Sequence, residues 1–180
     1  MSHKEEQLDR SAVVQEFNNL SKRLENDFPG ETFYIFIVGG VPLMEYTGYK
    51  KSSDIDVFAY SDSRLLDYFP DYFMNTRSAG MSSSFSADME DRVIDTEFST
   101  DNLKVYAASL EDIVASKLIA NRDKDIEDIS LPGVVEKINY EKLEKIIHEE
   151  LSIDLTPLNY NMLLITYDRW IEHLKQNNKI

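Results

Sequence analysis

Hydrophobic positions near the start of the chain change from a helical spacing to an unbroken run. Between residues 11 and 28, apolar side chains recur three and four positions apart, which predicts an amphipathic helix ending at the Pro-Gly pair that follows. Residues 33–38 (FYIFIV) are continuously apolar and rich in aromatic and β-branched side chains, as is typical of a buried strand. This strand ends in Gly39-Gly40, and we expect a short helix to begin near Val41-Pro42, because proline is tolerated in a first turn.

The middle of the chain alternates short apolar segments with turn-forming residues. Residues 55–60 predict a second buried strand. Ser61 or Asp62 can then cap a short helix that Pro70 ends or kinks. The stretch 78–88 (SAGMSSSFSAD) is rich in serine, and we expect it to be a mobile loop.

Two further strands and a helical remainder complete the predicted elements. Residues 92–99 and 103–107 have the pattern of strands joined by a Thr-Asp-Asn turn. Ser109 is expected to cap a helix, and the chain beyond it is helical up to a last helix over 157–176. A Pro-Gly pair at 132–133 interrupts these helices.

The order of these elements predicts an α+β fold. A small mixed β-sheet flanked by helices would occupy residues 1–108, with a helical C-terminal part over residues 109–180 packed on that core. Three aromatic residues of the last helix, Tyr160, Tyr167 and Trp170, fall at spacings of seven and three. We interpret this stripe as core packing and not as a surface for stacking bases.

Composition limits the chemistry that this chain can carry. Its 180 residues are 42% hydrophobic, which is enough to bury the core of one domain or of one domain with a small appendage. The chain has no cysteine, and its 3 histidines match no metal-ligand spacing. A bound metal is therefore expected to be a hard cation, Mg²⁺ or Mn²⁺, held by carboxylates.

Charge and hydropathy argue against two classes of binding partner, extended nucleic acids and membranes. The formal net charge of -14 argues against an extensive nucleic-acid footprint, which needs clustered Lys and Arg, although a local basic patch can still hold a polyanion. The N-terminus lacks the apolar run of a signal peptide, and no stretch approaches the roughly 18 apolar residues of a membrane helix. We therefore expect a cytoplasmic protein with no membrane partner.

Two aspartates, Asp54 and Asp56, stand at the start of the strand predicted over residues 55–60. In a strand, residues i and i+2 point to the same face, so two carboxylates would meet beside strongly apolar neighbours. A divalent cation between them would offset their mutual repulsion. The alternative is a solvated strand start in an acidic protein.

The glycine pair supplies the second candidate feature. Gly39-Gly40 would let backbone N–H groups approach a phosphate, and the helix N-terminus expected after it would favour an anion. Most glycine pairs are simple turns. The order of a buried strand, two glycines, a short helix and an Asp-x-Asp strand adds weight to a phosphate and metal site.

These segments resemble a known family signature. IVGG (37–40) followed by SSDIDVF (52–58) is similar to the glycine pair, helical spacer and Asp-x-Asp strand of the polymerase-β-type nucleotidyltransferase superfamily. The resemblance implies the nucleotidyltransferase fold, an NTP held near Gly39, Gly40 and Ser53, and two Mg²⁺ ions held by carboxylates.

The same resemblance implies a third carboxylate on a neighbouring strand. Asp95, in the segment RVIDTEF (92–98), fits the family's pattern of an aspartate between apolar residues, although Thr96 departs from it. Glu97 lies on the same face of the predicted strand and is the substitute. The expected catalytic and metal-binding set is therefore Asp54, Asp56 and Asp95, with Glu97 as the alternative third member.

A further segment, residues 109–129, resembles bacterial minimal nucleotidyltransferases, including those of the AbiE toxin type. The matching positions are Lys117, Lys124, Asp125 and Asp128. Independently, both lysines share a face if the helix is continuous, where they would offset triphosphate charge and matter little to the fold. An amphipathic helix with solvated charges is the alternative.

The leading hypothesis is a metal-dependent enzyme that moves a nucleoside monophosphate from an NTP to an unknown acceptor. By resemblance, the acceptor is tRNA or another RNA, a protein side chain or a small molecule. A second hypothesis is a non-catalytic module of the same fold that binds nucleotide or metal as a toxin–antitoxin or regulatory partner. A third hypothesis, a protein–protein adaptor that uses the helical tail, is supported by composition alone.

Overall fold

The computed structural model describes residues 7–48, 51–58, 63–76 and 84–180. It confirms the mixed α+β class, with a five-stranded mixed sheet and a larger number of helices. The chain forms two compact units: unit 1 comprises Met1–Ala79 and Val93–Ala108, and unit 2 comprises Gly80–Arg92 and Ser109–Ile180. The packing of the helical part on the sheet stays a prediction. Within the described ranges, no helix is both long and apolar enough to cross a membrane.

The sheet belongs to unit 1. Its strands are β1 (Phe33–Val38), β2 (Ile55–Phe58), β3 (Met74–Asn75), β4 (Ile94–Asp95) and β5 (Leu103–Ala107), in the spatial order β3-β2-β1-β5-β4. The central strand β1 is antiparallel to β2 and parallel to β5. At the edges, β3 runs parallel to β2, and β4 runs antiparallel to β5.

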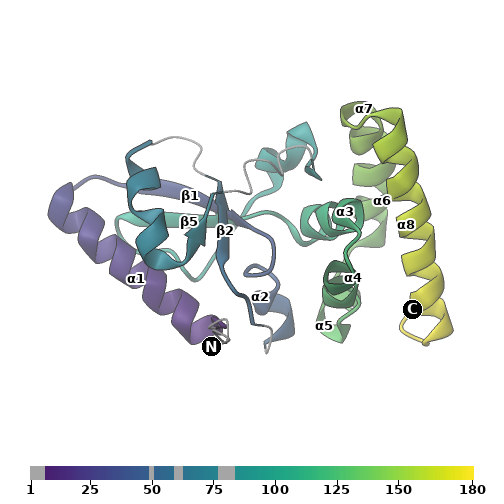
Figure 1. Cartoon of the computed structure of the whole chain (residues 1–180), viewed down its shortest axis with the longest axis horizontal. Coiled ribbons are helices and arrows are strands. Elements are labelled where there is room, and N and C mark those ends of the chain that lie inside the picture. The colour runs from purple at the N-terminus through teal and green to yellow at the C-terminus, as the bar shows by residue number, and fades with distance from the viewer. Residues whose placement is uncertain (1–6, 49–50, 59–62, 77–83) are drawn as a thin grey trace, which may run out of the picture. The chain divides into compact units, whose positions relative to one another are not determined.

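A long helix covers one face of this sheet. Helix α1 (Arg10–Asp27) is capped by Asp9, whose side chain accepts a hydrogen bond from the backbone N–H of Ala12, and it runs obliquely to the strands (Figure 1). The side chains between helix and sheet alternate along each strand and are almost fully buried: Val13, Phe17, Leu20, Leu24, Ile35, Ile37, Ile55, Val57, Val105 and Ala107. The opposite face of β2 therefore carries Asp56 and Phe58.

Shorter elements complete unit 1. Helix α2 (Met44–Thr47) follows β1, and the 3₁₀ helices η1 (Ser63–Asp67) and η2 (Phe69–Tyr72) lie between β2 and β3. Pro70 stands in the first turn of η2, so it begins an element and does not end one. The predicted capping residues 61 and 62, and most of the serine-rich segment, lie outside the described residues.

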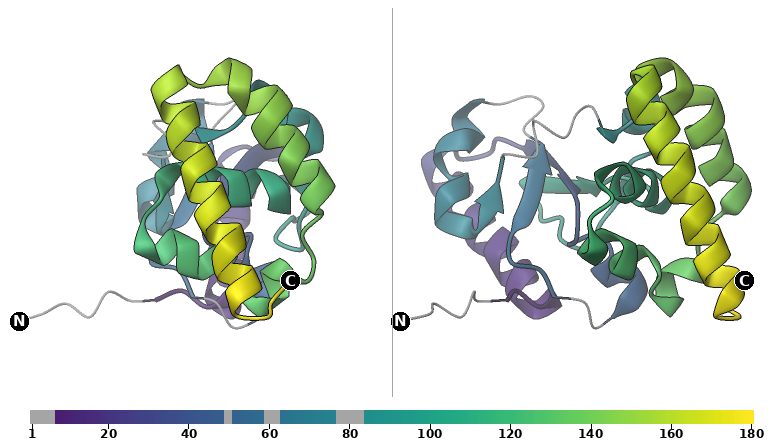
Figure 2. Two further views of the ribbon diagram at one scale, coloured as in Figure 1. Left: turned by 90° about the vertical axis from the view of Figure 1, so that its right-hand side faces the viewer. Right: turned by 45° about the vertical axis from the view of Figure 1, so that its right-hand side comes forward.

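Unit 2 is helical. It contains η4 (Ala87–Arg92), α3 (Leu110–Ala120), α4 (Asp123–Ile129), α5 (Pro132–Val135), α6 (Tyr140–Lys145), the π-helix η5 (Ile146–Glu150), α7 (Leu151–Asp154) and α8 (Pro157–Gln176). The last helix has the predicted bounds. Helix α3 contacts α4, α6 and α8 (Figure 2), which explains why nearly all of its residues are buried. Ser109 caps α3 as predicted, because its side chain accepts from the backbone N–H of Asp112.

The aromatic stripe of α8 packs inside unit 2. Trp170 is 1% exposed, and its indole N–H donates to Ser130 Oγ at 3.1 Å. Its ring packs against those of Tyr140 and Tyr167. Tyr160 is partly buried, and its hydroxyl contacts His148. Core packing is therefore confirmed for Tyr167 and Trp170. Burial, together with the nearby charge of Glu144, raises the pKa of Tyr167 to about 12.

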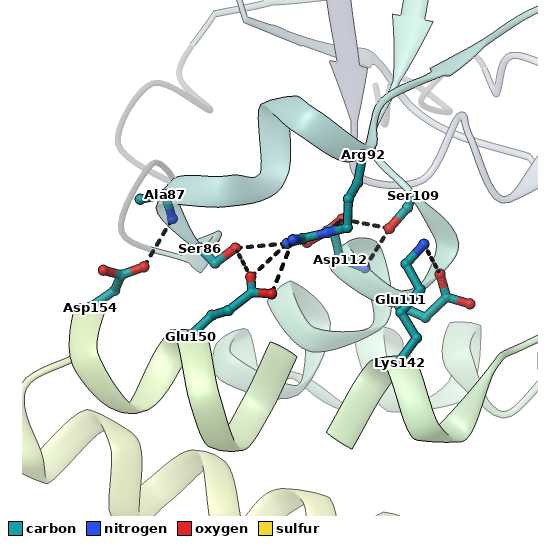
Figure 3. A network of polar contacts seen from close by, with 9 residues as sticks. All are labelled: Ser86, Ala87, Arg92, Ser109, Glu111, Asp112, Lys142, Glu150 and Asp154. Carbon is teal, nitrogen blue, oxygen red and sulfur yellow. Dashed lines mark hydrogen bonds and ion pairs between the residues drawn. The ribbon is translucent and has the colours of Figure 1, made fainter. Parts of the chain in front are cut away.

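A polar network holds η4 within unit 2 (Figure 3). The guanidinium of Arg92 donates to Asp112 Oδ1 at 2.7 Å, to Glu150 Oε2 at 2.8 Å and to Ser86 Oγ at 2.8 Å. Hydrogen bonding to Asp112 is the main reason why the pKa of Arg92 lies above its usual value, against the opposing effect of burial. The residues that were expected to begin a strand at 92 instead end a 3₁₀ helix. The predicted strand over 92–99 is therefore too long, since β4 has only two residues.

Candidate metal and nucleotide site

The Asp-x-Asp pair lies where strand β2 begins. Asp54 immediately precedes β2, and Asp56 is paired in register with Val38, the last residue of β1. Both carboxylates are partly exposed, whereas Ile55 and Val57 between and beside them are buried under α1. The alternation of the strand thus separates an apolar face from an acidic one, as the sequence predicted.

The glycine pair is in direct contact with this acidic face. Gly39 follows β1 with a φ of 73°, in the left-handed region that favours glycine. A Cβ atom placed on Gly39 would lie 2.3 Å from Asp56 Oδ2, so a side chain at this position would collide with the carboxylate. The glycine pair and the Asp-x-Asp pair therefore form one site. The Asp56 carboxylate occupies the space that a side chain at position 39 would fill.

A residue that sequence reasoning missed joins the two carboxylates. The side-chain amide of Asn75, on β3, donates from Nδ2 to Asp54 Oδ2 at 3.1 Å and to Asp56 Oδ1 at 3.5 Å. Asn75 is opposite Asp56 in the parallel register of β2 and β3. The short strand β3 carries no periodic pattern, so nothing in the sequence pointed to it.

The other predicted nucleotide-binding residues of unit 1 lie close by in the chain. Ser53 is exposed, and its hydroxyl donates to Asp54 Oδ1 at 3.2 Å. Gly40 lies in the turn after β1, but α2 does not follow at once: it begins at Met44 and has four residues. The expectation that a helix begins near Val41-Pro42, directly after the glycine pair, is therefore wrong. Phosphate binding by the backbone of the glycine pair stays a prediction.

The sheet order does not bring Asp95 to the pair. Register places Asp95 beside Tyr106, and the Phe36 and Tyr106 rings stack on the face that also carries Asp56. Asp95 and Asp56 thus share a face, but three strand spacings separate their strands, about 14 Å. The role of Asp95 as a third ligand stays a prediction that this arrangement of strands does not explain.

Glu97 has a different partner. It lies in a turn after β4 and forms an ion pair with Arg10, which also contacts Glu45 Oε2 at 3.4 Å. The other oxygen of Glu45 is buried without a hydrogen-bond partner among the described residues. Burial, and secondarily the charge of Glu97, raises the pKa of Glu45 above its usual value. These contacts give Glu97 a structural role at the start of α1.

Lys117 lies inside unit 2 and already has partners. It is 7% exposed, and its Nζ donates to Asp125 Oδ1 at 2.7 Å and to Asp128 Oδ2 at 2.9 Å. Burial alone would raise the pKa of Asp125, but hydrogen bonds from Arg122 and Lys117 outweigh it and hold this pKa below its usual value. The expectation that Lys117 matters little to the fold is therefore wrong, and so is the alternative of solvated charges at this position.

The continuous helix that was expected to place Lys117 and Lys124 on one face is interrupted. Helix α3 ends at Ala120, Asn121 takes a left-handed conformation with a φ of 50°, and α4 begins at Asp123. Lys124 is exposed in the first turn of α4. The shared face argued from a continuous helix does not exist, and nucleotide binding by Lys117 and Lys124 rests on the resemblance alone.

The residues around Asp54 fit a hard divalent cation. Two carboxylates and one side-chain amide converge there, and all of their possible ligand atoms are oxygens. Such donors suit Mg²⁺ or Mn²⁺ and not the softer metals that prefer sulfur or imidazole. Across the part of the chain that the structure describes, no three Asp, Glu, His or Cys side chains lie close enough to hold a metal.

Comparison with known proteins identifies the class. Residues 11–175 match the family described as "Nucleotidyltransferase of unknown function (DUF6036)", and the chain belongs to this family. The match spans both units and confirms the nucleotidyltransferase part of the resemblance. No curated protein and no solved structure shows a significant match to the chain.

Proposed function

We propose that the protein transfers a nucleoside monophosphate from an NTP to an acceptor in a metal-dependent reaction. The main support for this proposal is the contact between the glycine pair and the Asp-x-Asp pair. Asp56 Oδ2 occupies the space that a side chain at Gly39 would fill. This contact joins the acidic pair to a glycine turn in a chain that belongs to a nucleotidyltransferase family.

The roles of the residues follow from their chemistry. Asp54 and Asp56 hold a divalent cation through their carboxylate oxygens, and Ser53 orients Asp54 through its hydroxyl. The backbone N–H groups of the glycine turn contact the phosphates of the NTP beside the acidic face. When bound, the cation neutralises triphosphate charge and lowers the pKa of the attacking hydroxyl.

The proposed reaction is a single displacement. An acceptor oxygen attacks the α-phosphorus of the NTP and forms a new phosphoester bond, while the bond to the oxygen that bridges to the β-phosphorus breaks. Pyrophosphate leaves, and the acceptor hydroxyl loses its proton to a base in solution. The chain's residues contribute by positioning and by charge, because phosphoryl-type transfer depends mostly on those two effects.

Pyrophosphate release tests this activity. The protein is incubated with Mg²⁺, the four NTPs and a cell extract as the source of acceptor, and pyrophosphate is measured. We expect release by the wild type and none by Asp56→Asn, which keeps the shape of the side chain but removes its charge. Glu136→Gln, an exposed carboxylate in unit 2, is the control that should retain activity. Equal release by wild type and Asp56→Asn would refute the assignment.

One observation favours a second function. Asp95 does not lie beside the Asp-x-Asp pair, and among the described residues no three Asp, Glu, His or Cys side chains are assembled. A module that binds nucleotide or metal without turnover would have such an incomplete site. Mg²⁺-dependent nucleotide binding with no pyrophosphate release, across all four NTPs, would favour this alternative.

The acceptor is proposed only as a class: RNA, a protein side chain or a small molecule. The similarity of residues 109–129 to AbiE-type toxins suggests that transfer could stop growth. Expression of the wild type and of Asp56→Asn in a bacterial host compares the two directly. Growth arrest by the wild type alone would support a toxin role, and equal growth would contradict it.

A further inference from the structure

Asn75 is placed where a third ligand of the proposed cation would be needed. It stands on the edge strand β3, directly beside Asp56, and its amide contacts both members of the acidic pair. The strand is anchored at this point, because the backbone N–H of Ile55 donates to the carbonyl of Phe73 at 2.9 Å. The position of Asn75 is thus fixed by sheet pairing and not by a free loop.

The orientation of its amide follows from charge. Ionised carboxylates only accept hydrogen bonds, so the NH₂ group of Asn75 must face Asp54 and Asp56 when no cation is present. Its two hydrogens allow one bond to each carboxylate, which offsets part of the repulsion between two like charges. An aspartate at position 75 would instead add a third negative charge.

A side-chain amide offers a second chemistry at the same place. Rotation about its last side-chain bond exchanges the nitrogen and oxygen positions with almost no change of shape. The oxygen is then a hard ligand of the kind that Mg²⁺ and Mn²⁺ accept, and an asparagine serves in this way in kinases.

We propose that Asn75 is the third protein ligand of the divalent cation that Asp54 and Asp56 hold, an inference that rests on the proposed function. Without metal, its NH₂ group holds the two carboxylates; with metal, it turns and presents Oδ1 to the ion. The site then carries a protein charge of minus two and not minus three. Asparagine therefore supplies a third oxygen without the repulsion that three carboxylates would create in the metal-free protein.

Manganese binding measures this role without reference to activity. Mn²⁺ is titrated into the full-length wild type, Asn75→Ala and Asn75→Asp, and the free ion is followed by its electron paramagnetic resonance signal. We expect Asn75→Ala to weaken binding by roughly ten-fold or more. Asn75→Asp should bind Mn²⁺ more tightly than the wild type, because added ligand charge raises affinity. Asn19→Ala, exposed on α1, is the control and should bind like the wild type.

Thermal stability separates ligation from a structural role. In metal-free buffer, Asn75→Asp should melt below the wild type, and saturating Mn²⁺ should raise its melting temperature by more than that of the wild type. A residue that only supports the fold would lower stability in both variants and leave Mn²⁺ affinity unchanged, which would overturn the inference.

Two outcomes distinguish this inference from the proposed function. If the wild type and both Asn75 variants bind Mn²⁺ alike while Asp54→Asn abolishes binding, the metal site stands and only the role of Asn75 is overturned. If the wild type itself binds no Mn²⁺ in the presence or absence of NTP, the metal-dependent function fails, and the inference about Asn75 fails with it.

Discussion

Replacing Gly39 by alanine tests whether the glycine turn and the acidic strand form one site. The substitution adds a single methyl group, but it does so at a φ of 73°, beside the Asp56 carboxylate. Two different costs follow, one from the backbone conformation and one from the collision. Two further glycines with positive φ in the described part of the chain separate these costs, because at Gly30 (φ 78°) and Gly48 (φ 69°) an added Cβ meets nothing within 4 Å.

The backbone cost is the same at all three positions. A residue with a Cβ in the left-handed region costs about 1–2 kcal/mol. For a chain of this length, that cost lowers the melting temperature by roughly 2–4 °C per kcal/mol. Gly30→Ala and Gly48→Ala should show this loss alone.

The collision adds to the cost at Gly39 only. The new methyl carbon would lie 2.3 Å from Asp56 Oδ2 but 3.4 Å from Asp56 Cβ, so it is the carboxylate that must move. Because this carboxylate is the partly exposed end of a flexible side chain, the cost of moving it is at the lower end of the range for an added methyl, about 1 kcal/mol. Gly39→Ala should therefore be the least stable of the three alanine variants by about that amount.

A double-mutant cycle assigns the excess to Asp56. Asp56→Ala removes the carboxylate and leaves the Cβ, which is at an ordinary contact distance. In that background, Gly39→Ala should cost only the backbone term, so a coupling of about 1 kcal/mol is expected between the two positions. The assay is urea denaturation followed by circular dichroism. Equal losses for all three glycine variants, or an excess at Gly39 that persists with Asp56→Ala, would refute the contact.

Three other predictions follow from the contacts. Lys117→Met should lower the free energy of unfolding by about 3 kcal/mol, because it removes the buried ammonium that bridges Asp125 and Asp128 and leaves Arg122 as the cation beside Asp125. The exposed Lys124→Met should change it by no more than about 0.5 kcal/mol, and equal effects in urea denaturation would contradict the buried ion pairs. Arg92→Lys keeps the charge but loses the forked contacts to two carboxylates, so it should lower the urea midpoint more than Arg169→Lys on the exposed face of α8. Because the pKa of Glu45 is raised in the fold, its contribution to stability is present below its unfolded pKa and is lost as the pH rises through its folded pKa. Glu45→Gln should therefore melt above the wild type at pH 7 but not below about pH 4, and a difference that grows toward acid would show that the sign is wrong.

Sequence reasoning succeeded where a pattern was long or a signal was local. The strand over residues 33–38 and the helix over 157–176 have the predicted bounds, because a continuous apolar run and an uninterrupted helical period leave little ambiguity. The cap at Ser109 was also predicted, since a short hydroxyl side chain before a helix satisfies a free backbone N–H.

The features that the sequence did not predict share a physical cause. Each of them depends on contacts between residues that are distant in the sequence. Strand β3 has two residues and exists only because β2 pairs with it, so neither β3 nor Asn75 could be read from periodicity. The distance between Asp95 and Asp56 follows from the order of the strands in the sheet, and a single sequence does not encode that order in a simple pattern. The break at Asn121 did have a signal, because asparagine tolerates the left-handed conformation that ends many helices.

Labelled NTPs show directly whether the protein transfers a nucleoside monophosphate or a phosphate. The protein is incubated with Mg²⁺, a cell extract and NTPs labelled either at the α- or at the γ-phosphate, and RNA, protein and small molecules are separated. Nucleotidyl transfer predicts that the α-label enters one of these fractions while the γ-label appears in pyrophosphate, and that Asp56→Asn does neither. Transfer of the γ-label to an acceptor, or equal transfer of the α-label by Asp56→Asn, would contradict the account.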